Sequence, residues 1–404
     1  MTLWVHRLMA DEPYTISFAL RVTGRALLGL SFHGADHLNG AVADWFPVST
    51  FMLGSGALAF LLVEWLAPWR YRQKQEARER SLAGSLVSAW GFDTLAPFAL
   101  RADKSYFFSE DECAFLAYRV VGGVAIVSGD PIGPGDSHPQ LVRRFLDFVH
   151  ERGWRLAVLG VSESSLGIYR SLGLRALYHG DEAVIETISF SLDGRRIRKV
   201  RQSVHRLRNA GFTARVLRPS DIHAELRGTL EQVAQEWRGS QPERGFVMAL
   251  DGLFRLGDEE ALFVVGFDPD GRPGGFLHYA LTRAGSALSL SSMPRRCDVP
   301  NGLTEWLICE SIDWARLNGL ARVSLNFSPF AALLAPETAL TRTQRIEAAV
   351  LKRSKGWFQL DNLHAFNRKF FPAWERRYIV YERRRDLPRV GVAALAAELY
   401  LPFQ

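Results

Sequence analysis

Cysteine is scarce in this sequence: Cys113, Cys297 and Cys309 are the only three in 404 residues, and none forms a Cys-x-x-Cys pair. A disulfide scaffold or a structural zinc site of ordinary spacing is therefore not expected. The charge excess is also small, with 49 Lys and Arg against 43 Asp and Glu, and it does not by itself indicate a nucleic-acid binder. The hydrophobic share of 48% is typical of a globular chain and excludes a disordered or collagen-like one.

The usual catalytic signatures are missing as well. The sequence has no GxxxxGK[ST] loop, no HExxH motif, no GxSxG elbow and no Rossmann fingerprint. An enzyme of this kind has to work by positioning and proton transfer, and we expect neither a metal nor a cofactor. Acyl transfer from an already activated donor fits this limitation, because the donor carries the energy.

One long apolar run stands near the start of the chain. Residues 48–68 read VSTFMLGSGALAFLLVEWLAP, which is enough to cross a hydrocarbon core of about 30 Å, with Glu64 near one end as the exception. The Arg- and Lys-rich stretch from Arg70 predicts that the rest of the chain is cytoplasmic. We therefore expect residues 1–80 to form a membrane-associated helical segment with a basic linker, including an amphipathic helix over 14–33. The alternative for 48–68 is a buried core helix.

After this segment, short apolar runs alternate with amphipathic helical patterns in two rounds. The first round predicts strands at 114–121, 124–127, 156–161 and 183–188, with helices at 139–152 and 164–172. The second predicts strands at 213–217, 261–268, 274–282, 286–291 and 323–327, with helices at 220–238 and 302–317. This order predicts an α/β (α+β) fold of mixed sheets flanked by helices.

A strongly basic helix is predicted between the two rounds. Residues 195–208 read RRIRKVRQSVHRLR, with seven Arg or Lys, and Ile197, Val200, Val204 and Leu207 recur on one helical face. No acid at i+4 relieves the repulsion within the run. The phosphates of RNA or of lipid headgroups are suitable partners, while the alternative is a solvated surface helix.

Six phrases of the sequence together resemble one family. They are FALRADKSYFF (98–108), VGGVAIVSGDPIGP (121–134), GRRIRKVRQSVHRLRNAGF (194–212), PNGLTEWLI (300–308), SLNFSPF (324–330) and HAFNRKFFPAWERRYIVYE (364–382). In this order they resemble the cytoplasmic synthase domain of the phosphatidylglycerol lysyltransferases, the multiple peptide resistance factor family, over about residues 80–385.

The resemblance implies a fold, a reaction and partners. The fold is a tandem of two GNAT-like domains, placed here at 81–193 and 194–404. The reaction is transfer of an aminoacyl group from aminoacyl-tRNA to a hydroxyl of phosphatidylglycerol or a related anionic lipid. The implied partners are aminoacyl-tRNA, an anionic membrane lipid and the membrane surface, with the catalytic part on the cytoplasmic side of the cell membrane.

The resemblance also implies binding residues. For substrate binding these are Asp130, Asn326, Asn367 and Arg377, where Asp130 belongs to a Gly-Asp-Pro turn that has the alternative role of simply ending a strand. For tRNA or phosphate binding they are Arg198, Lys199, Arg201, Arg206 and Arg208.

Three further residues are candidates for catalysis. Glu305, on the first turn of a predicted helix, is the candidate base, or else an acid that favours the helix dipole. Lys369 and Arg295 are expected to hold phosphate or the developing oxyanion. The alternative for Lys369, Asn367 and Arg377 is that they fix the C-terminal helix through salt bridges.

One departure from the family pattern concerns the substrate. In SLSSMPRRCD (289–298), Ser291 replaces an acid that the family commonly has, and Pro294 displaces the following arginine to Arg295. A neutral or differently charged amino acid, or another acceptor lipid, is compatible with this change. Two other functions stay open: an acyl-CoA-dependent GNAT-like acyltransferase, for which we find no Q/RxxGxG/A loop, and a degenerate module that binds lipid or nucleic acid.

Overall fold

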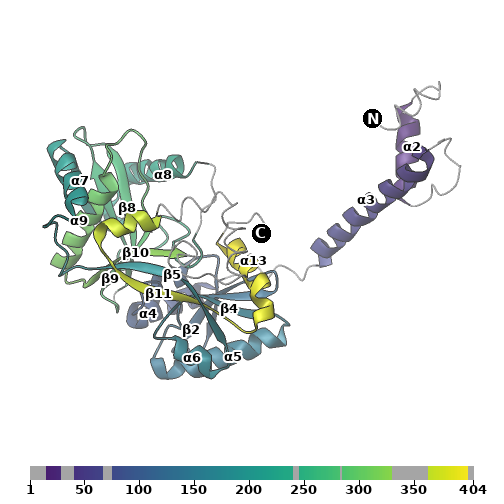
Figure 1. Cartoon of the computed structure of the whole chain (residues 1–404), viewed down its shortest axis with the longest axis horizontal. Coiled ribbons are helices and arrows are strands. Elements are labelled where there is room, and N and C mark those ends of the chain that lie inside the picture. The colour runs from purple at the N-terminus through teal and green to yellow at the C-terminus, as the bar shows by residue number, and fades with distance from the viewer. Residues whose placement is uncertain are drawn as a thin grey trace. The chain divides into compact units, whose positions relative to one another are not determined.

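The computed structural model describes residues 15–28, 41–66, 75–239, 245–282, 284–329 and 363–398. Contacts within the chain divide it into two compact units, Met1–Arg72 and Gln73–Gln404. Each unit is described by itself below, and Figure 1 labels their elements.

The first unit contains two helices, α2 (Ile16–Leu27) and α3 (Ala41–Leu66). Thr15 begins α2, where its hydroxyl accepts a hydrogen bond from the Phe18 N–H at 3.3 Å. Phe18 and Val22 pack against Phe46 of α3. Residues 48–66 are thus helical, but among the described residues no helix is both long and apolar enough to cross a membrane. The transmembrane helix expected over 48–68 is not confirmed.

The second unit is built on one mixed sheet. Its described strands are β1 (Ser105–Phe108), β2 (Phe115–Val121), β3 (Val124–Ser128), β4 (Arg155–Ser162), β5 (Arg175–Glu186), β6 (Thr213–Leu217), β7 (Ala261–Phe267), β8 (Pro273–Thr282), β9 (Ala287–Ser292), β10 (Arg322–Pro329) and β11 (Ala373–Tyr381). They are ordered β1-β2-β3-β4-β11-β5-β10-β9-β8-β7-β6. Only β3 with β4 and β9 with β10 run parallel. The predicted mixed α/β architecture is confirmed.

Helices cover both faces of the β1–β4 half of the sheet. α4 (Ala77–Trp90) and α13 (Leu387–Ala397) share a core with Ile126, whereas α5 (His138–Glu151) and α6 (Leu166–Ser171) share one with Val127. Neighbouring residues of β3 thus face opposite layers, as the period of a strand requires. A short 3-10 helix, η1 (Ala96–Leu100), follows α4 and is buried.

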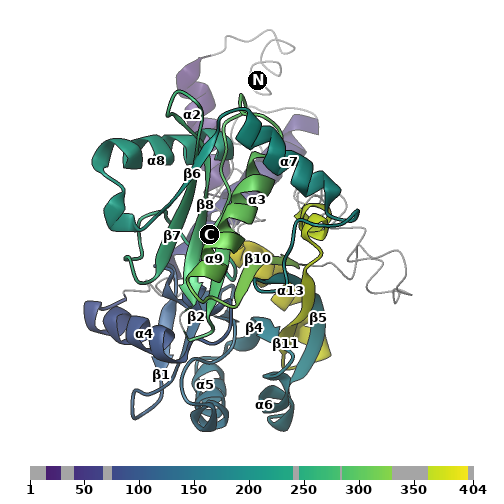
Figure 2. The ribbon, with the colours of Figure 1, turned by 90° about the vertical axis from the view of Figure 1, so that its left-hand side faces the viewer.

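The β6–β10 half is layered in the same way. α7 (Arg198–Asn209) and α9 (Leu303–Leu317) pack on Val264, and α8 (Ala224–Arg238) packs with Phe263 on the other face. Figure 2 shows α8 on one side of this half and α7 with α9 on the other. The predicted basic helix is confirmed, although it begins at Arg198 and not at residue 195, and its apolar face is buried as its periodicity indicates.

β11 is the strand that joins the two halves. It comes from the C-terminal end of the chain, yet it lies between β4 and β5 and runs antiparallel to both. The boundary expected between 193 and 194 falls between β5 and α7. β11 follows that boundary in the sequence, but both of its partner strands, β4 and β5, precede it. The division into 81–193 and 194–404 stays a prediction.

Candidate active site

A pocket of about 420 Å³ opens where β3 and β4 end. Its walls come from residues 90–94 and 96, 128–133, 135 and 138, and 162, 164 and 165, and from Arg322 and Glu375. The carboxyl ends of parallel strands meet at one edge of a sheet, which is where ligands bind in open α/β sheets. We call this feature the strand-end pocket; its volume is in the range of small-molecule sites.

Asp130, a predicted substrate-binding residue, lines this pocket. Gly129, with φ +74°, turns the chain directly after β3, and the Asp130 carboxylate then accepts hydrogen bonds from Ser162 N (3.1 Å) and Ser162 Oγ (2.5 Å). Burial, and next the charge of Asp93, raise the pKa of Asp130 to about 6. The two roles predicted for Asp130, in a turn that ends a strand and in substrate binding, are thus compatible, because the turn places its carboxyl group in the pocket wall.

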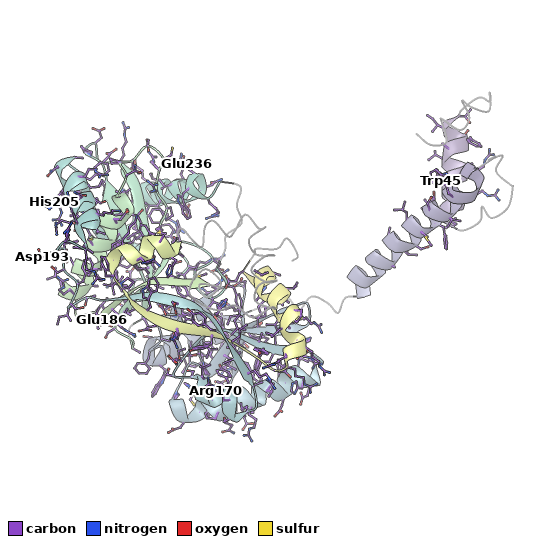
Figure 3. All side chains as sticks on the ribbon, viewed as in Figure 1. Trp45, Arg170, Glu186, Asp193, His205 and Glu236 are labelled. Atoms are coloured by element: carbon purple, nitrogen blue, oxygen red, sulfur yellow. The ribbon has the colours of Figure 1, made fainter. Side chains whose placement is uncertain are left out.

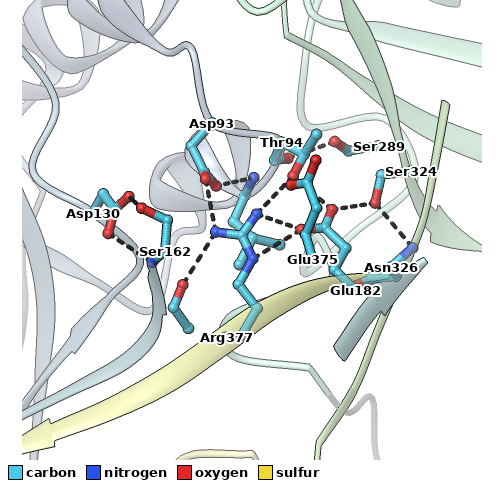
Figure 4. A network of polar contacts seen from close by, with 12 residues as sticks. Asp93, Thr94, Asp130, Ser162, Glu182, Ser289, Ser324, Asn326, Glu375 and Arg377 are labelled. Atoms are coloured by element: carbon cyan, nitrogen blue, oxygen red, sulfur yellow. Dashed lines mark hydrogen bonds and ion pairs between the residues drawn. The ribbon is translucent and has the colours of Figure 1, made fainter. Parts of the chain in front are cut away.

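A buried arginine lies behind the pocket wall. Arg377 of β11 donates from Nη1 to Asp93 Oδ2 at 2.7 Å and from Nε to Glu182 Oε2 at 2.8 Å, and its Nη2 also pairs with Glu182. Figure 4 shows its guanidinium between these two acids, with Asp130 and Ser162 nearby. Burial alone would lower the pKa of Arg377, but Asp93 and Glu182 raise it above the ordinary value. The guanidinium therefore stays charged.

The same contacts continue across β10, and we call the whole set the Arg377 network. Its members are Asp93, Thr94, Glu182, Ser324, Asn326 and Arg377. Glu182 accepts from Thr94 Oγ1 at 2.6 Å and from the Ser324 hydroxyl, which in turn accepts from Asn326 N at 3.1 Å. The network places Asp93 in the pocket wall and fixes β5, β10 and β11 against one another.

Asn326 and Asn367 are the other two predicted substrate-binding residues, and both lie deeper in the fold. Asn326, with φ +73°, sits in a β-bulge of β10 just beyond the point where backbone pairing with β9 ends, and its side-chain amide donates to Leu290 O at 2.8 Å. The Asn367 amide donates to Leu325 O at 3.4 Å. Neither lines the strand-end pocket.

The predicted catalytic residues form a separate group. Lys369, in the 3-10 helix η4 (Arg368–Phe370), makes an ion pair of 2.9 Å with Glu305 on the first turn of α9. Arg295 forms a backbone bridge with Gly275 of β8. None of the three lines the strand-end pocket. The ion pair joins η4 to α9 and does not involve the C-terminal helix α13, so the alternative role of Lys369 stays a prediction.

The five basic residues predicted on α7 divide into two sets. Arg201 donates to Leu192 O and Gly194 O, and Arg206 donates to Asn301 O at 2.9 Å. Arg208 pairs with Glu310 at 2.8 Å. Arg198 and Lys199 are exposed, and neither forms an ion pair with a residue in the described ranges. Figure 3 shows His205 of the same helix at the surface.

Several site residues were missed from the sequence. Asp93, Thr94, Ser162 and Glu182 belong to no motif that we recognised, and β11 itself was not predicted as a strand. One signal was available: Glu182 stands directly before the apolar residues Ala183 and Val184 of a strand. An acid in such a position has to find a buried partner.

Comparison with known proteins now identifies the family. The family description "Phosphatidylglycerol lysyltransferase, C-terminal" matches residues 85–381. The chain belongs to this family. It is 37% identical over 399 residues to the lysylphosphatidylglycerol biosynthesis bifunctional protein LysX of Mycobacterium avium, covering 97% of this chain and 33% of that protein. With LysX of Mycobacterium tuberculosis the identity is 38% over 330 residues, covering 80% and 28%. The chain thus spans about a third of the length of these relatives.

Solved structures support the fold. L-PGS from Bacillus licheniformis superimposes with a TM-score of 0.70 at 22% identity, covering 81% of this chain and 98% of that one. A C-terminal domain (DUF2156) from Agrobacterium fabrum gives 0.69 at 23% identity, covering 81% and 99%. In this member of the family Ser291, the position that departs from the expected acid, accepts a hydrogen bond from Leu250 N at 3.0 Å.

Proposed function

We propose that this chain transfers an aminoacyl group from an aminoacyl-tRNA to the hydroxyl of a membrane lipid, phosphatidylglycerol or a related anionic lipid. The observation that carries the proposal is the strand-end pocket, an acid-lined cavity at the carboxyl edge of parallel strands in a phosphatidylglycerol lysyltransferase family member. The names of the relatives, which concern lysylphosphatidylglycerol biosynthesis, support the reaction class.

The chemistry of the pocket suits an aminoacyl ester. Such a substrate carries a positive α-ammonium beside its reactive carbonyl, and Asp93, Asp130 and Glu375 contribute carboxyl groups to the lining. Trp90 and Phe92 also belong to the lining, and aromatic rings attract cations. We assign Asp130 to the α-ammonium. Ester-to-ester exchange needs no external energy, so positioning and proton transfer are sufficient.

The basic surface suits the phosphates of the donor. Arg198 and Lys199 are exposed on α7 and form no ion pair with a residue that the structure describes, so they suit contact with a polyanion. Lys369 and Arg295 are proposed to contact phosphate, and Glu305 is the base predicted from the sequence. For that role Glu305 has to leave its ion pair with Lys369. We further propose that the two halves of the sheet are tandem GNAT-like domains, and that catalysis takes place at the cytoplasmic face of the cell membrane.

A reconstituted assay tests the function. The purified full chain is incubated with vesicles containing phosphatidylglycerol and with tRNAs charged with one labelled amino acid at a time. We expect a labelled lipid whose mass equals phosphatidylglycerol plus one aminoacyl residue, and the amino acid that gives it identifies the donor. Vesicles of phosphatidylcholine alone are the acceptor control. Absence of any aminoacyl-lipid with every charged tRNA would overturn the proposal.

Two aspartates of one loop supply matched variants. Asp130→Asn removes the negative charge in the pocket while keeping a side chain that can bond Ser162. Asp136→Asn makes the same change at an exposed position of the 3-10 helix η2 (Gly135–Ser137), outside the lining. We expect the rate to fall at least about tenfold in the first variant, which corresponds to about 1.4 kcal/mol, and to stay unchanged in the second.

A further inference from the structure

One exposed phenylalanine has a backbone conformation that is unusual for its type. Phe371 ends the 3-10 helix η4 with φ +54° and ψ +50°, in the left-handed region, and Pro372 follows it. A bulky residue is an outlier there, and a following proline restricts the backbone further. Burial of the ring does not compensate fully, because Phe371 is 46% exposed. Residues held in such conformations cluster at binding and catalytic sites, so this one calls for a function.

Basic residues lie beside this ring. The guanidinium of Arg196, two residues before the start of α7, lies over the ring, with its carbon 4.3 Å from the ring centroid. Arg195 and Arg196 are exposed and form no ion pair with a residue in the described ranges, and the exposed Arg198 and Lys199 follow directly on α7. Figure 2 shows the segment of η4, in yellow, next to α7, and the two elements are in contact.

An exposed aromatic ring among cations is suited to single-stranded RNA. The cations contact phosphates, and the ring stacks on a base that is not paired. The sequence 195–208 contains no aromatic residue, so by itself it predicts phosphate contact alone. The fold adds the ring from a distant part of the chain.

A membrane surface is a poorer match for the same group. Within 195–209 and 367–371, Phe371 is the only large apolar residue that is exposed. Membrane insertion depends on the apolar area that is buried, and a single half-exposed ring contributes little of it. Stacking on a base, in contrast, requires only one ring. The observations therefore favour RNA over lipid as the partner of Phe371.

The position of Phe371 along the chain relates it to the strand-end pocket. β11 begins two residues after it, and Glu375, four residues after it, lines the pocket. An extended chain advances at most about 3.6 Å per residue, so the Cα atoms of Phe371 and Glu375 lie within about 14 Å of each other. The aminoacyl ester of a charged tRNA is on the last nucleotide of an unpaired 3′ end. An ester in the pocket thus brings the adjoining unpaired bases into the range of this ring.

We propose that Phe371 stacks on an unpaired base at the 3′ end of the donor tRNA, and that Arg196 contacts a phosphate next to that base. This inference rests on the proposed function, which supplies the donor. Phe371 takes no part in bond making or breaking. It holds the 3′ end so that the terminal ester reaches the strand-end pocket.

Binding to two RNAs tests this contact. The full chain is titrated with deacylated tRNA and with the same tRNA lacking its unpaired 3′ nucleotides. Phe371→Asn removes the ring, and asparagine is enriched in the left-handed region. We expect this variant to bind the intact tRNA about tenfold more weakly, because one stacked base contributes on that order. Its affinity for the shortened tRNA should equal that of the wild type.

Three further measurements distinguish stacking from other roles. The slope of log affinity against log salt should not change in Phe371→Asn, because no phosphate contact is removed with the ring. Phe371→Trp should restore the affinity, since it returns an aromatic face. The melting temperature of Phe371→Asn should be equal to or above that of the wild type, because the left-handed conformation suits asparagine better. Trp237→Ala, at another exposed aromatic residue, on α8, is the matched control and should bind as the wild type does.

Each outcome decides the inference. A loss of affinity for the intact tRNA alone supports it, whereas an equal loss for both RNAs, or none for either, overturns it. Weaker binding to phosphatidylglycerol vesicles with unchanged affinity for tRNA also overturns it, since the ring then contacts lipid. If Phe371→Asn unfolds, Phe371→Gly replaces it under the same criteria.

Failure of the proposed function has a different signature. If Phe371→Asn binds tRNA as the wild type does and forms aminoacyl-lipid at the wild-type rate, only the stacking contact is overturned. If the loss of affinity depends on the 3′ end but no charged tRNA yields an aminoacyl-lipid, the stacking contact is supported and the proposed reaction is overturned.

Discussion

Ion pairs between arginines and acids occur in two regions of this molecule, and they have a different role in each. Arg377 is enclosed by Asp93 and Glu182 at the centre of the sheet, whereas Arg208 meets Glu310 on the exposed surface of α7 and α9. The buried network fixes β5, β10 and β11 and holds a wall of the strand-end pocket. On α7, Arg208 forms an ion pair, whereas Arg198 and Lys199 are exposed and form none with the part of the chain that the structure describes.

The difference shows that a basic residue in a family motif has a role set by its surroundings. Arg377 and the α7 residues were all predicted to bind a ligand. Arg377 contacts buried acids, and its exposed fraction of 1% keeps it from the solvent. Removing a charge is therefore expected to affect stability in the first region and polyanion binding in the second.

Arg377→Met is expected to have the largest effect on stability. It leaves Glu182 and Asp93 without their cation in a buried site, and breaking such a pair costs about 3–5 kcal/mol of the free energy of unfolding. Chemical denaturation measures this value. Arg376→Met, at the exposed neighbouring position of β11, is the control, with a change within about 0.5 kcal/mol. The double variant Arg377→Met/Glu182→Gln should recover part of the loss, and its failure to do so would contradict the assigned ion pair.

Asp130 provides the second test, because its carboxyl is buried beside another acid. The pKa of Asp130 in the folded chain, about 6, is above the reference value of 3.8 for aspartate. Its contribution to the free energy of unfolding is therefore fully present below about pH 4 and is lost as the pH rises through 6. Asp130→Asn removes this contribution, so the wild type should lose stability relative to the variant between pH 4 and 6. If the denaturation midpoints of the wild type and of Asp130→Asn change equally between pH 4 and 6, the raised pKa of Asp130 is contradicted.

A third prediction compares the two sets of basic residues on α7. Arg198→Ala/Lys199→Ala should reduce the slope of log affinity for tRNA against log salt by about 1.4–1.8, because each phosphate contact contributes about 0.7–0.9. The free energy of unfolding should change by less than about 0.5 kcal/mol. Arg201→Ala/Arg206→Ala is the matched pair of charge removals, and it should cost about 1 kcal/mol for each lost hydrogen bond. Equal salt slopes in the two double variants would contradict the division of the α7 residues into exposed cations and cations that are bonded within the chain.

The periodicity of single elements was predictable, whereas their assembly was not. The strand at 213–217 and the helices around 220–238 and 302–317 follow from apolar spacing and are confirmed to within a few residues. β5 was expected from residue 183 but begins at Arg175, because its first half, which includes His179 and Asp181, lacks an apolar run. β11 carries Glu375, Arg376 and Arg377 in succession and was missed for the same reason.

The site was predictable in part, through the motif residues themselves. Asp130 reaches the pocket because a Gly-Asp turn after a strand directs it there. The partners of Arg377 come from positions 195 and 284 residues away in the sequence, and pairing at such separations leaves no local pattern. The placement of Glu305 and Lys369 beside each other follows from the fold in the same way, and their catalytic roles stay predictions.

The Glu305–Lys369 pair is expected to contribute little to the free energy of unfolding. The Lys369 side chain is 40% exposed, so water screens the interaction, and a double-mutant cycle of Glu305→Gln and Lys369→Met should give a coupling below about 1 kcal/mol. The same variants test catalysis with little disturbance of folding. If Glu305 acts as the base, Glu305→Gln should slow lipid aminoacylation about a hundredfold or more, because general base catalysis contributes on that order. A rate within about threefold of the wild type would contradict the role of Glu305 as the base and leave the pair as a surface contact between α9 and η4.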